Sequence, residues 1–317
     1  MEMLDSRQLR AQTARRLQEA AYPPRRLALL HSGIALACSL ALTVVSYFLS
    51  RQISGTGGLS GIGTRTVLQS VQSVLSTALT VGMPFWEFGF IAAAMGFARQ
   101  ETVGPKTLLT GFRRFRAIVG LLLLQIIIYG LMAVVAAQIA SAAVLMTPFG
   151  TGLLEVMQTL SENAEFMESG VFPQEMMEQL LQAAIPVYVT AGLLFIAAAV
   201  PLSYRLRLCR YFALDMERPR GIACLLQSSR AMKGNCMAFF KLDLSFWWYW
   251  ALQGVCSLLA FGDVLLPLIG IELPIGADAA MFLFYGLQLA GSLALAWAWR
   301  APVETAYALA YDHITEE

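Results

Sequence analysis

The sequence predicts an all-α, polytopic membrane protein: a bundle of six transmembrane helices with amphipathic helices at the membrane surface. Three observations support this fold class. Hydrophobic residues make up 57% of the 317 residues and charged residues only 14%, whereas a soluble domain carries about 25% charged residues. Six segments are apolar over the roughly 20 residues that a helix needs to cross a bilayer. Lysine and arginine are concentrated in alternate connections between these segments.

The six spans follow one another as continuously apolar runs, without the period-two alternation of barrel strands. The second span lies in the stretch from Val67 to Phe97, which is too long for an upright crossing. We therefore expect Gly82 and Pro84 to kink or break it. The spans are expected at about 27–49, 74–97, 117–146, 183–204, 242–261 and 279–299.

The basic residues predict the orientation of the chain. Of the 22 lysines and arginines, only Arg51 and Arg65 lie on one side of the predicted bundle, and the other 20 lie on the opposite side. Because basic loops stay in the cytoplasm, both termini are expected to be cytoplasmic. The expected organisation is a basic cytoplasmic helix at 1–26 and a transmembrane domain at 27–301, with an acidic outer loop at 147–182, a basic cytoplasmic loop at 205–241 and a cytoplasmic tail at 302–317.

Three amphipathic segments are expected on the cytoplasmic side, at 5–21, 105–116 and 219–233. The second would place Leu108, Leu109, Phe112 and Phe115 on one face. Such segments either bind anionic lipid at the inner leaflet or only pack against the bundle and follow the topology rule. The basic residues expected either to bind lipid head groups or only to follow the topology rule are Arg113, Arg114, Arg116, Arg220, Arg230 and Lys233.

Glu87 is the most informative single residue. It lies about ten residues from the cytoplasmic end of the second span, hence about 15 Å deep. An ionised carboxylate at that depth is costly, so burial, neutralisation or access to water is expected. No lysine or arginine is expected deep in another span to pair with it. A protonated Glu87 would instead hydrogen-bond to one of the polar residues of other spans: Gln125, Gln138, Gln288 or Tyr285.

No enzyme signature is evident. His31 and His313 are the only histidines, and neither has the spaced partners of a zinc site. No phosphate-binding glycine motif precedes a helix, and the net charge of +1 does not favour nucleic acid. We therefore expect no cofactor, no metal, no nucleic acid and no enzymatic activity. The expected partners are the lipid bilayer, anionic lipid at the inner leaflet and another membrane protein.

Several motifs resemble a bacterial family of integral membrane proteins catalogued as domain of unknown function 975. They are the run Ala213–Pro219, the run Ser228–Asn235 ending in MKGN, the span entry Phe240–Phe246, and a short basic opening helix at Ser6–Arg15. The resemblance implies a multi-helix protein of the bacterial cytoplasmic membrane. The family has no established activity, so it implies no site residues.

The sequence leaves three functions open. The first is a non-enzymatic accessory, scaffold or envelope-associated membrane factor, favoured because no catalytic group of residues is found. The second is a small transporter or channel that uses the carboxylate of Glu87. The third is a membrane enzyme that modifies lipid, which would need two convergent polar residues at one leaflet. A polar cavity that reaches Glu87 would favour the second, and a dry bundle the first.

Overall fold

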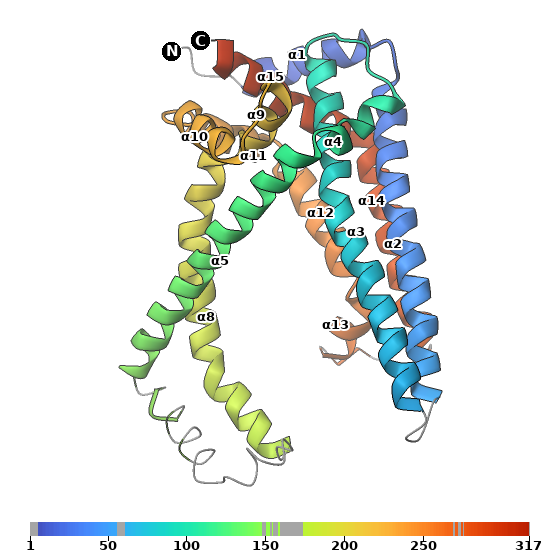
Figure 1. The fold of residues 1–317 in the computed structure, drawn as a ribbon, viewed down its shortest axis with the longest axis vertical. Helices are drawn as coiled ribbons and strands as arrows, with labels where there is room; N and C mark the ends of the chain where they lie inside the picture. The colour runs from blue at the N-terminus through green and yellow to red at the C-terminus, as the bar shows by residue number, and fades with distance from the viewer. Residues whose placement is uncertain are drawn as a thin grey trace. The chain divides into compact units, whose positions relative to one another are not determined.

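The computed structural model describes residues 6–55, 61–147, 150–152, 154, 158, 174–268, 270–271, 274 and 276–316. Every regular element within these ranges is helical (Figure 1). The fold is therefore all-α in the part of the chain that the structure describes. Most of the expected acidic outer loop at 147–182 lies outside the described residues.

Five stretches of helix are long and apolar enough to cross a membrane. They are formed by α2 (Pro24–Gly55), α3 (Gly61–Ala98), α5 (Phe115–Leu145), α8 (Gln174–Arg205) with α9 (Cys209–Asp215), and α14 (Ala277–Leu295) with η2 (Ala296–Arg300) and α15 (Ala301–Glu316). Ile126, Ile127 and Leu131 of α5 are more than 60% exposed. Such side chains are matched to lipid tails and are costly in water.

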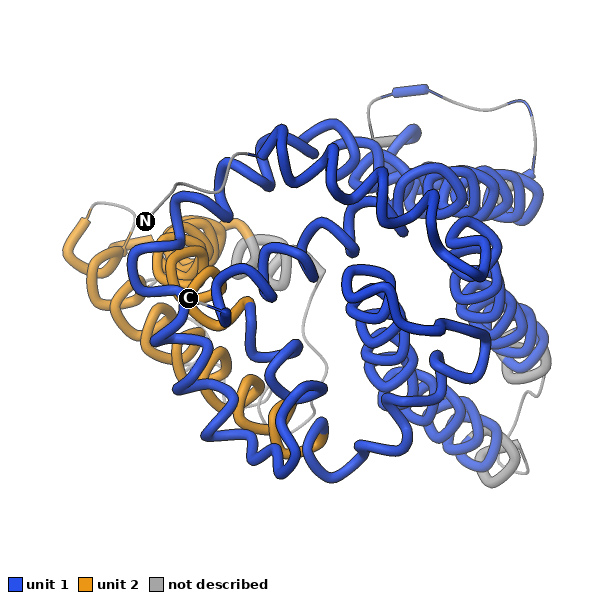
Figure 2. Tube along the Cα trace, turned by 90° about the horizontal axis from the view of Figure 1, so that it is seen from above, with its two compact units in different colours: residues 1–118, 208–317 blue, residues 119–207 orange. Residues whose placement is uncertain are grey.

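The chain forms two compact units (Figure 2). Residues 1–118 and 208–317 make up the first, and residues 119–207 make up the second. The second unit contains most of α5 and all of α8. All sites described below lie within the first unit.

Of the kink or break expected at Gly82 and Pro84, the break does not occur. Helix α3 runs for 38 residues without interruption, with Pro84 inside it. Proline removes one backbone hydrogen bond, and membrane helices tolerate this where neighbouring groups compensate. Gly82 has open space around its Cα. Helix α3 is therefore one continuous element, and Glu87 lies within it.

The predicted span at 242–261 is divided. Helix α11 (Cys236–Ser245) ends at Phe246, where α12 (Trp247–Leu259) begins, and α13 (Gly262–Leu268) follows. Phe246 has the non-helical backbone angles φ −113° and ψ 18°. Helix α12 packs against α14 in the first unit. At 13 residues it is about 20 Å long, so it is too short to count among the five membrane-length helices.

The expected amphipathic segment at 105–116 folds as two short pieces, η1 (Pro105–Leu109) and α4 (Thr110–Arg113). Leu108 is fully buried, but Leu109, Phe112 and Phe115 are about half exposed. The four residues therefore do not share one buried face: Leu108 points into the first unit, whereas the other three are half exposed. The other two expected segments contain α1 (Ser6–Gln18) and α10 (Gly221–Ala231).

Two glycines allow this segment to approach α3 backbone to backbone. A Cβ atom at Gly89 of α3 would lie 1.8 Å from the carbonyl oxygen of Leu108. A Cβ atom at Gly111 of α4 would lie 1.9 Å from the carbonyl oxygen of Phe85. Neither position has room for a side chain. The contact thus depends on small residues, as close helix packing in membranes commonly does.

The segment that we expected to be a tail, 302–317, forms the helix α15 as far as Glu316. Val303, Ala306, Ala308 and Ala310 are buried, so α15 lies inside the first unit. It packs against α1 and α3. The small alanine side chains permit this close packing, and the rings of Tyr307 and Tyr311 contact Phe239 of α11 and Phe212 of α9.

Candidate functional site

A polar cavity of about 210 Å³ lies among α2, α3, α12, α14 and η2. Each of these five elements contributes at least one polar side chain, and that of η2 is Arg300. Apolar walls come from residues such as Leu36, Met83 and Ala296. The polar lining consists of Ser32, Glu87, Tyr249, Gln253, Gln288, Ser292 and Arg300.

Glu87 and Arg300 form an ion pair in this cavity. Nη2 of Arg300 donates to Oε2 of Glu87 at 2.6 Å, and Nη1 donates to Oγ of Ser32 at 3.1 Å. The guanidinium also lies 5.0 Å above the centre of the Phe90 ring. Arg300 is therefore held by a carboxylate, a hydroxyl and an aromatic face, an arrangement that suits the planar guanidinium.

The expectation that no cation would pair with Glu87 is wrong. The sequence places Arg300 directly after the sixth predicted span, where a basic residue usually marks the membrane surface. In the structure the helix does not end there. It continues through a π-helical turn at Ala296–Arg300 into α15, so Arg300 lies near the middle of one long helical stretch. A sequence signal was present: Glu304 is the only charged residue between Ala301 and Tyr311.

The other polar candidates divide between several places. Gln288 lines the cavity with Glu87. The Tyr285 hydroxyl lies 3.0 Å from Oγ of Ser39 and 3.2 Å from Oγ1 of Thr43, both on α2. Tyr285 therefore links α14 to α2 and does not contact Glu87 as proposed. Gln125 and Gln138 belong to α5 in the second unit, whereas Glu87 finds its partner, Arg300, in the first.

His31 is fully buried beside the cavity, a role that the sequence did not suggest. Its Nε2 donates to the carbonyl oxygen of Trp86 at 3.1 Å, and Nε1 of Trp86 donates to the carbonyl oxygen of His31 at 2.9 Å. The two rings are stacked, with centroids 5.3 Å apart. These reciprocal contacts fix α2 against α3 one residue before Glu87.

Three buried polar atoms around the site have no hydrogen-bond partner within the described residues: Nδ1 of His31, Nε of Arg300 and Oε1 of Gln288. Buried polar groups are usually satisfied, and an orphaned donor or acceptor costs about 1–3 kcal/mol. Two of the three belong to residues that line the cavity. Water or a small polar solute in the cavity would supply the missing partners.

A second charged cluster lies at the end of α3. Arg99 forms ion pairs with Asp215 at 2.6 Å and with Asp312 at 2.7 Å, and the hydroxyl of Tyr311 donates to Asp215 at 3.0 Å. The hydrogen bond to Asp312, assisted by the one to Asp215, raises the pKa of Arg99 further above its ordinary value. The cluster joins the end of α3 to α9 and α15. None of its residues lines the polar cavity at Glu87.

The expected lipid-contacting basic residues have different surroundings. Nη1 of Arg114 donates to the carbonyl oxygens of Met216 at 2.7 Å and Ala213 at 3.3 Å, so Arg114 caps the end of α9. Arg113 and Arg116 are exposed and line a separate groove. The three remaining residues are exposed on α10 or directly beside it: Arg220, Arg230 and Lys233.

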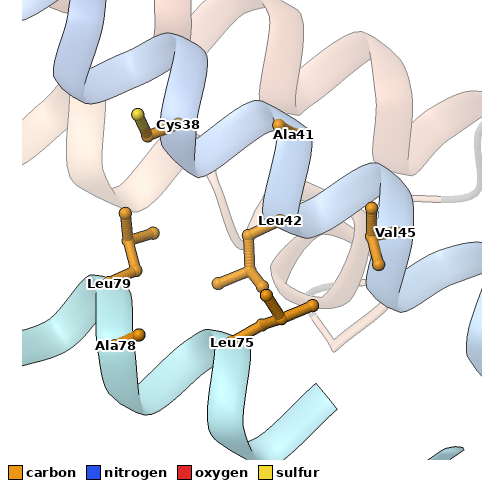
Figure 3. Close-up of a pocket in the computed structure, with 7 residues that line it drawn as sticks. All are labelled: Cys38, Ala41, Leu42, Val45, Leu75, Ala78 and Leu79. Carbon is orange, nitrogen blue, oxygen red and sulfur yellow. The ribbon is translucent and has the colours of Figure 1, made fainter. Parts of the chain in front are cut away.

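An apolar groove of about 440 Å³ lies between α2 and α3, lined by residues such as Cys38, Leu42 and Leu75 (Figure 3). It has no charged or strongly hydrogen-bonding side chain. Within the described residues, no group of three or more His, Cys, Asp or Glu side chains could hold a metal ion. The polar cavity at Glu87 is therefore the site whose chemistry is most distinctive.

Comparisons of the chain with protein-family models, with curated proteins and with solved structures found no match.

Proposed function

We propose that this protein is a small membrane carrier whose polar cavity, at Glu87 and Arg300, binds a small hydrophilic solute. The observation that supports the proposal is the cavity itself, which reaches the Glu87–Arg300 ion pair. A buried ion pair is weak evidence for stability, because apolar replacements of similar volume often stabilise a protein as well or better. Ionisable groups within membrane spans commonly belong to transport paths.

The size and chemistry of the cavity limit the solute. At about 210 Å³ the cavity is smaller than the 300–1,000 Å³ typical of drug-sized ligands. It suits a solute of the size of a small carboxylate or amino acid, or a few waters. The unpartnered Nε of Arg300 is a donor and Oε1 of Gln288 is an acceptor. A solute that both accepts and donates hydrogen bonds, such as an amino acid, would pair with both atoms.

The proposal includes six spans, with both termini in the cytoplasm of a bacterial cell. The two terminal helices, α1 and α15, pack against each other, which supports an even number of crossings. With α12 and α13 together as the fifth crossing, 19 of 22 lysines and arginines fall on the side of the termini, two fall on the other side, and Arg300 lies in the cavity. Placement in the bacterial cytoplasmic membrane also follows from the resemblance to domain of unknown function 975.

An accessory or scaffold role is the competing proposal, and it differs in what the ion pair does. In a scaffold the pair of Glu87 and Arg300 only joins α3 to η2, and no water or solute enters the cavity from outside. A lipid-modifying enzyme would need two convergent polar groups at one leaflet. The cavity provides convergent groups inside the bundle instead, so the carrier is the function that the geometry favours.

Solute flux distinguishes the carrier from the scaffold. The full chain is reconstituted in liposomes and tested with radiolabelled glycine, alanine, lactate and acetate. We expect at least one of them to enter faster than into empty liposomes, and Gln253→Leu, which removes a polar group of the cavity wall without changing the ion pair, to reduce that flux at least tenfold. Leu287→Ala on the exposed side of α14 is the matched control and should transport normally. No flux of any of the four above the empty-liposome rate would favour the scaffold.

A further inference from the structure

A second groove, of about 510 Å³, lies where α5 begins. It is separate from the polar cavity and shares no lining residue with it. Its walls are the end of α4 with the first residues of α5, and the connection between α9 and α10. It carries charges of both signs, from Arg113, Arg114, Arg116 and Glu217.

The framework of the groove is held in place by Arg114. Its two hydrogen bonds to the carbonyl oxygens of Ala213 and Met216 fasten the α4–α5 junction to the end of α9. Arg114 is thereby occupied, and its neighbours are not. Within the described residues, the side chains of Arg113, Arg116 and Glu217 are exposed and form no ion pair or hydrogen bond. Three cationic groups, Arg114 included, and one anionic group thus line the groove, and Glu217 forms no ion pair with any of them.

The groove lies at the boundary of an apolar helix. Arg116 is the last charged residue of α5, whose remaining residues from 117 to 145 are uncharged and mostly apolar. Phe112 and Phe115, beside the arginines, are 45% and 50% exposed. Arginines at the end of a long apolar helix commonly extend to the membrane interface, where lipid head groups lie. The groove would therefore face head groups wherever α5 crosses a bilayer.

We propose that this groove binds the head group of a zwitterionic aminophospholipid. Arg113 and Arg116 pair with the phosphodiester, and Glu217 accepts hydrogen bonds from the primary ammonium group. Arginine is well suited to phosphate because its guanidinium is a rigid fork of donors. Glu217 is the feature that selects the head group: it repels a purely anionic lipid, and it finds no N–H donor on a quaternary choline group.

This proposal does not rest on transport by the Glu87 cavity, and it requires only that α5 crosses a membrane. It also differs from general attraction to anionic lipid, which any basic surface provides. General attraction predicts a preference for phosphatidylglycerol, whereas the groove predicts a preference for phosphatidylethanolamine. The two interpretations therefore predict opposite orders of affinity.

The test is native mass spectrometry of the full chain. The protein in detergent is mixed with phosphatidylethanolamine, phosphatidylglycerol or phosphatidylcholine of the same acyl chains, and the lipid that stays bound after release from the detergent is measured. We expect phosphatidylethanolamine to bind about fivefold more tightly than the other two, the factor that ~1 kcal/mol represents. Glu217→Gln should abolish the preference, and Glu217→Lys should reverse it in favour of phosphatidylglycerol. Arg113→Gln with Arg116→Gln should weaken all three lipids.

Arg230→Gln with Lys233→Gln is the control, because both residues are exposed and neither lines the groove. This variant should keep the wild-type order of affinity. Soluble phosphoethanolamine is tested as a competitor, and we expect it not to displace the lipid at millimolar concentration. Displacement by the soluble compound would mean that the groove binds a free solute. A wild-type preference that survives both Glu217 variants, or equal binding of all three lipids to the wild type, would overturn the proposal.

Discussion

Replacing Arg300 with alanine will lower the free energy of unfolding by about 1–3 kcal/mol, because it leaves the partly exposed carboxylate of Glu87 without its counter-ion. The loss also removes the hydrogen bond to Ser32 and the contact with the Phe90 ring. The measurement is chemical unfolding in mild detergent, followed by tryptophan fluorescence. The same variant should transport no solute, since Arg300 is the cation of the proposed site.

A double variant separates stability from function. Glu87→Leu combined with Arg300→Met removes both charges and should return stability to within about 1.5 kcal/mol of the wild type, since apolar pairs replace buried ion pairs at little cost. We expect this stable variant to be inactive in the flux assay. A double variant that still transports solute would show that the ion pair is only a structural contact. A single Arg300→Ala variant with unchanged stability would contradict the pairing itself.

Replacing Gly111 or Gly89 with alanine will also be strongly destabilising, by about 3 kcal/mol or more for each. Overpacking a core typically costs about 1–3 kcal/mol. Here the added methyl group meets backbone oxygens at under 2 Å, which cannot move aside as a side chain can. To make room, η1 and α4 must separate from α3. The midpoint of thermal unfolding in detergent, measured by circular dichroism, should fall accordingly.

Gly82→Ala is the matched control, because it lies on the same helix as Gly89 and has nothing within 4 Å of a Cβ atom. It should leave the midpoint unchanged or raise it slightly, since alanine favours helix. Equal effects of Gly82→Ala and Gly89→Ala would show that η1 and α4 do not contact α3 backbone to backbone.

Much of the fold could be predicted from composition and length alone. The apolar runs that became α2, α3, α5, α8 and α14 are long enough that no other regular structure could satisfy their backbone in lipid. The amphipathic N-terminal helix also lies where its periodicity predicts. These signals are local, because each depends only on residues that are adjacent in the sequence. The helices could therefore be predicted without knowing how the rest of the chain folds.

The predictions that failed depend on contacts between distant residues. Packing between helices decides that the helix is interrupted at Phe246 and that α3 continues through Pro84. A hydropathy profile contains no information about such packing. The partner of Glu87 was missed because one arginine after an apolar run resembles the end of a span. The π-helical turn that keeps Arg300 within the bundle has no sequence signature of its own. Glu87 itself could be found, since a carboxylate inside an apolar run is conspicuous in any sequence.

The central claim, that water reaches the Glu87–Arg300 cavity inside the membrane, is tested most directly by chemical labelling of Ser292→Cys. The variant is made in a Cys38→Ala background, because Cys38 is the exposed native cysteine. Membranes are treated with a small charged methanethiosulfonate, and the intact protein is weighed. We predict rapid labelling of Ser292→Cys, which lines the cavity, and none of Leu287→Cys, an exposed residue on the same helix that faces lipid. Protection of both cysteines would contradict a water-filled cavity.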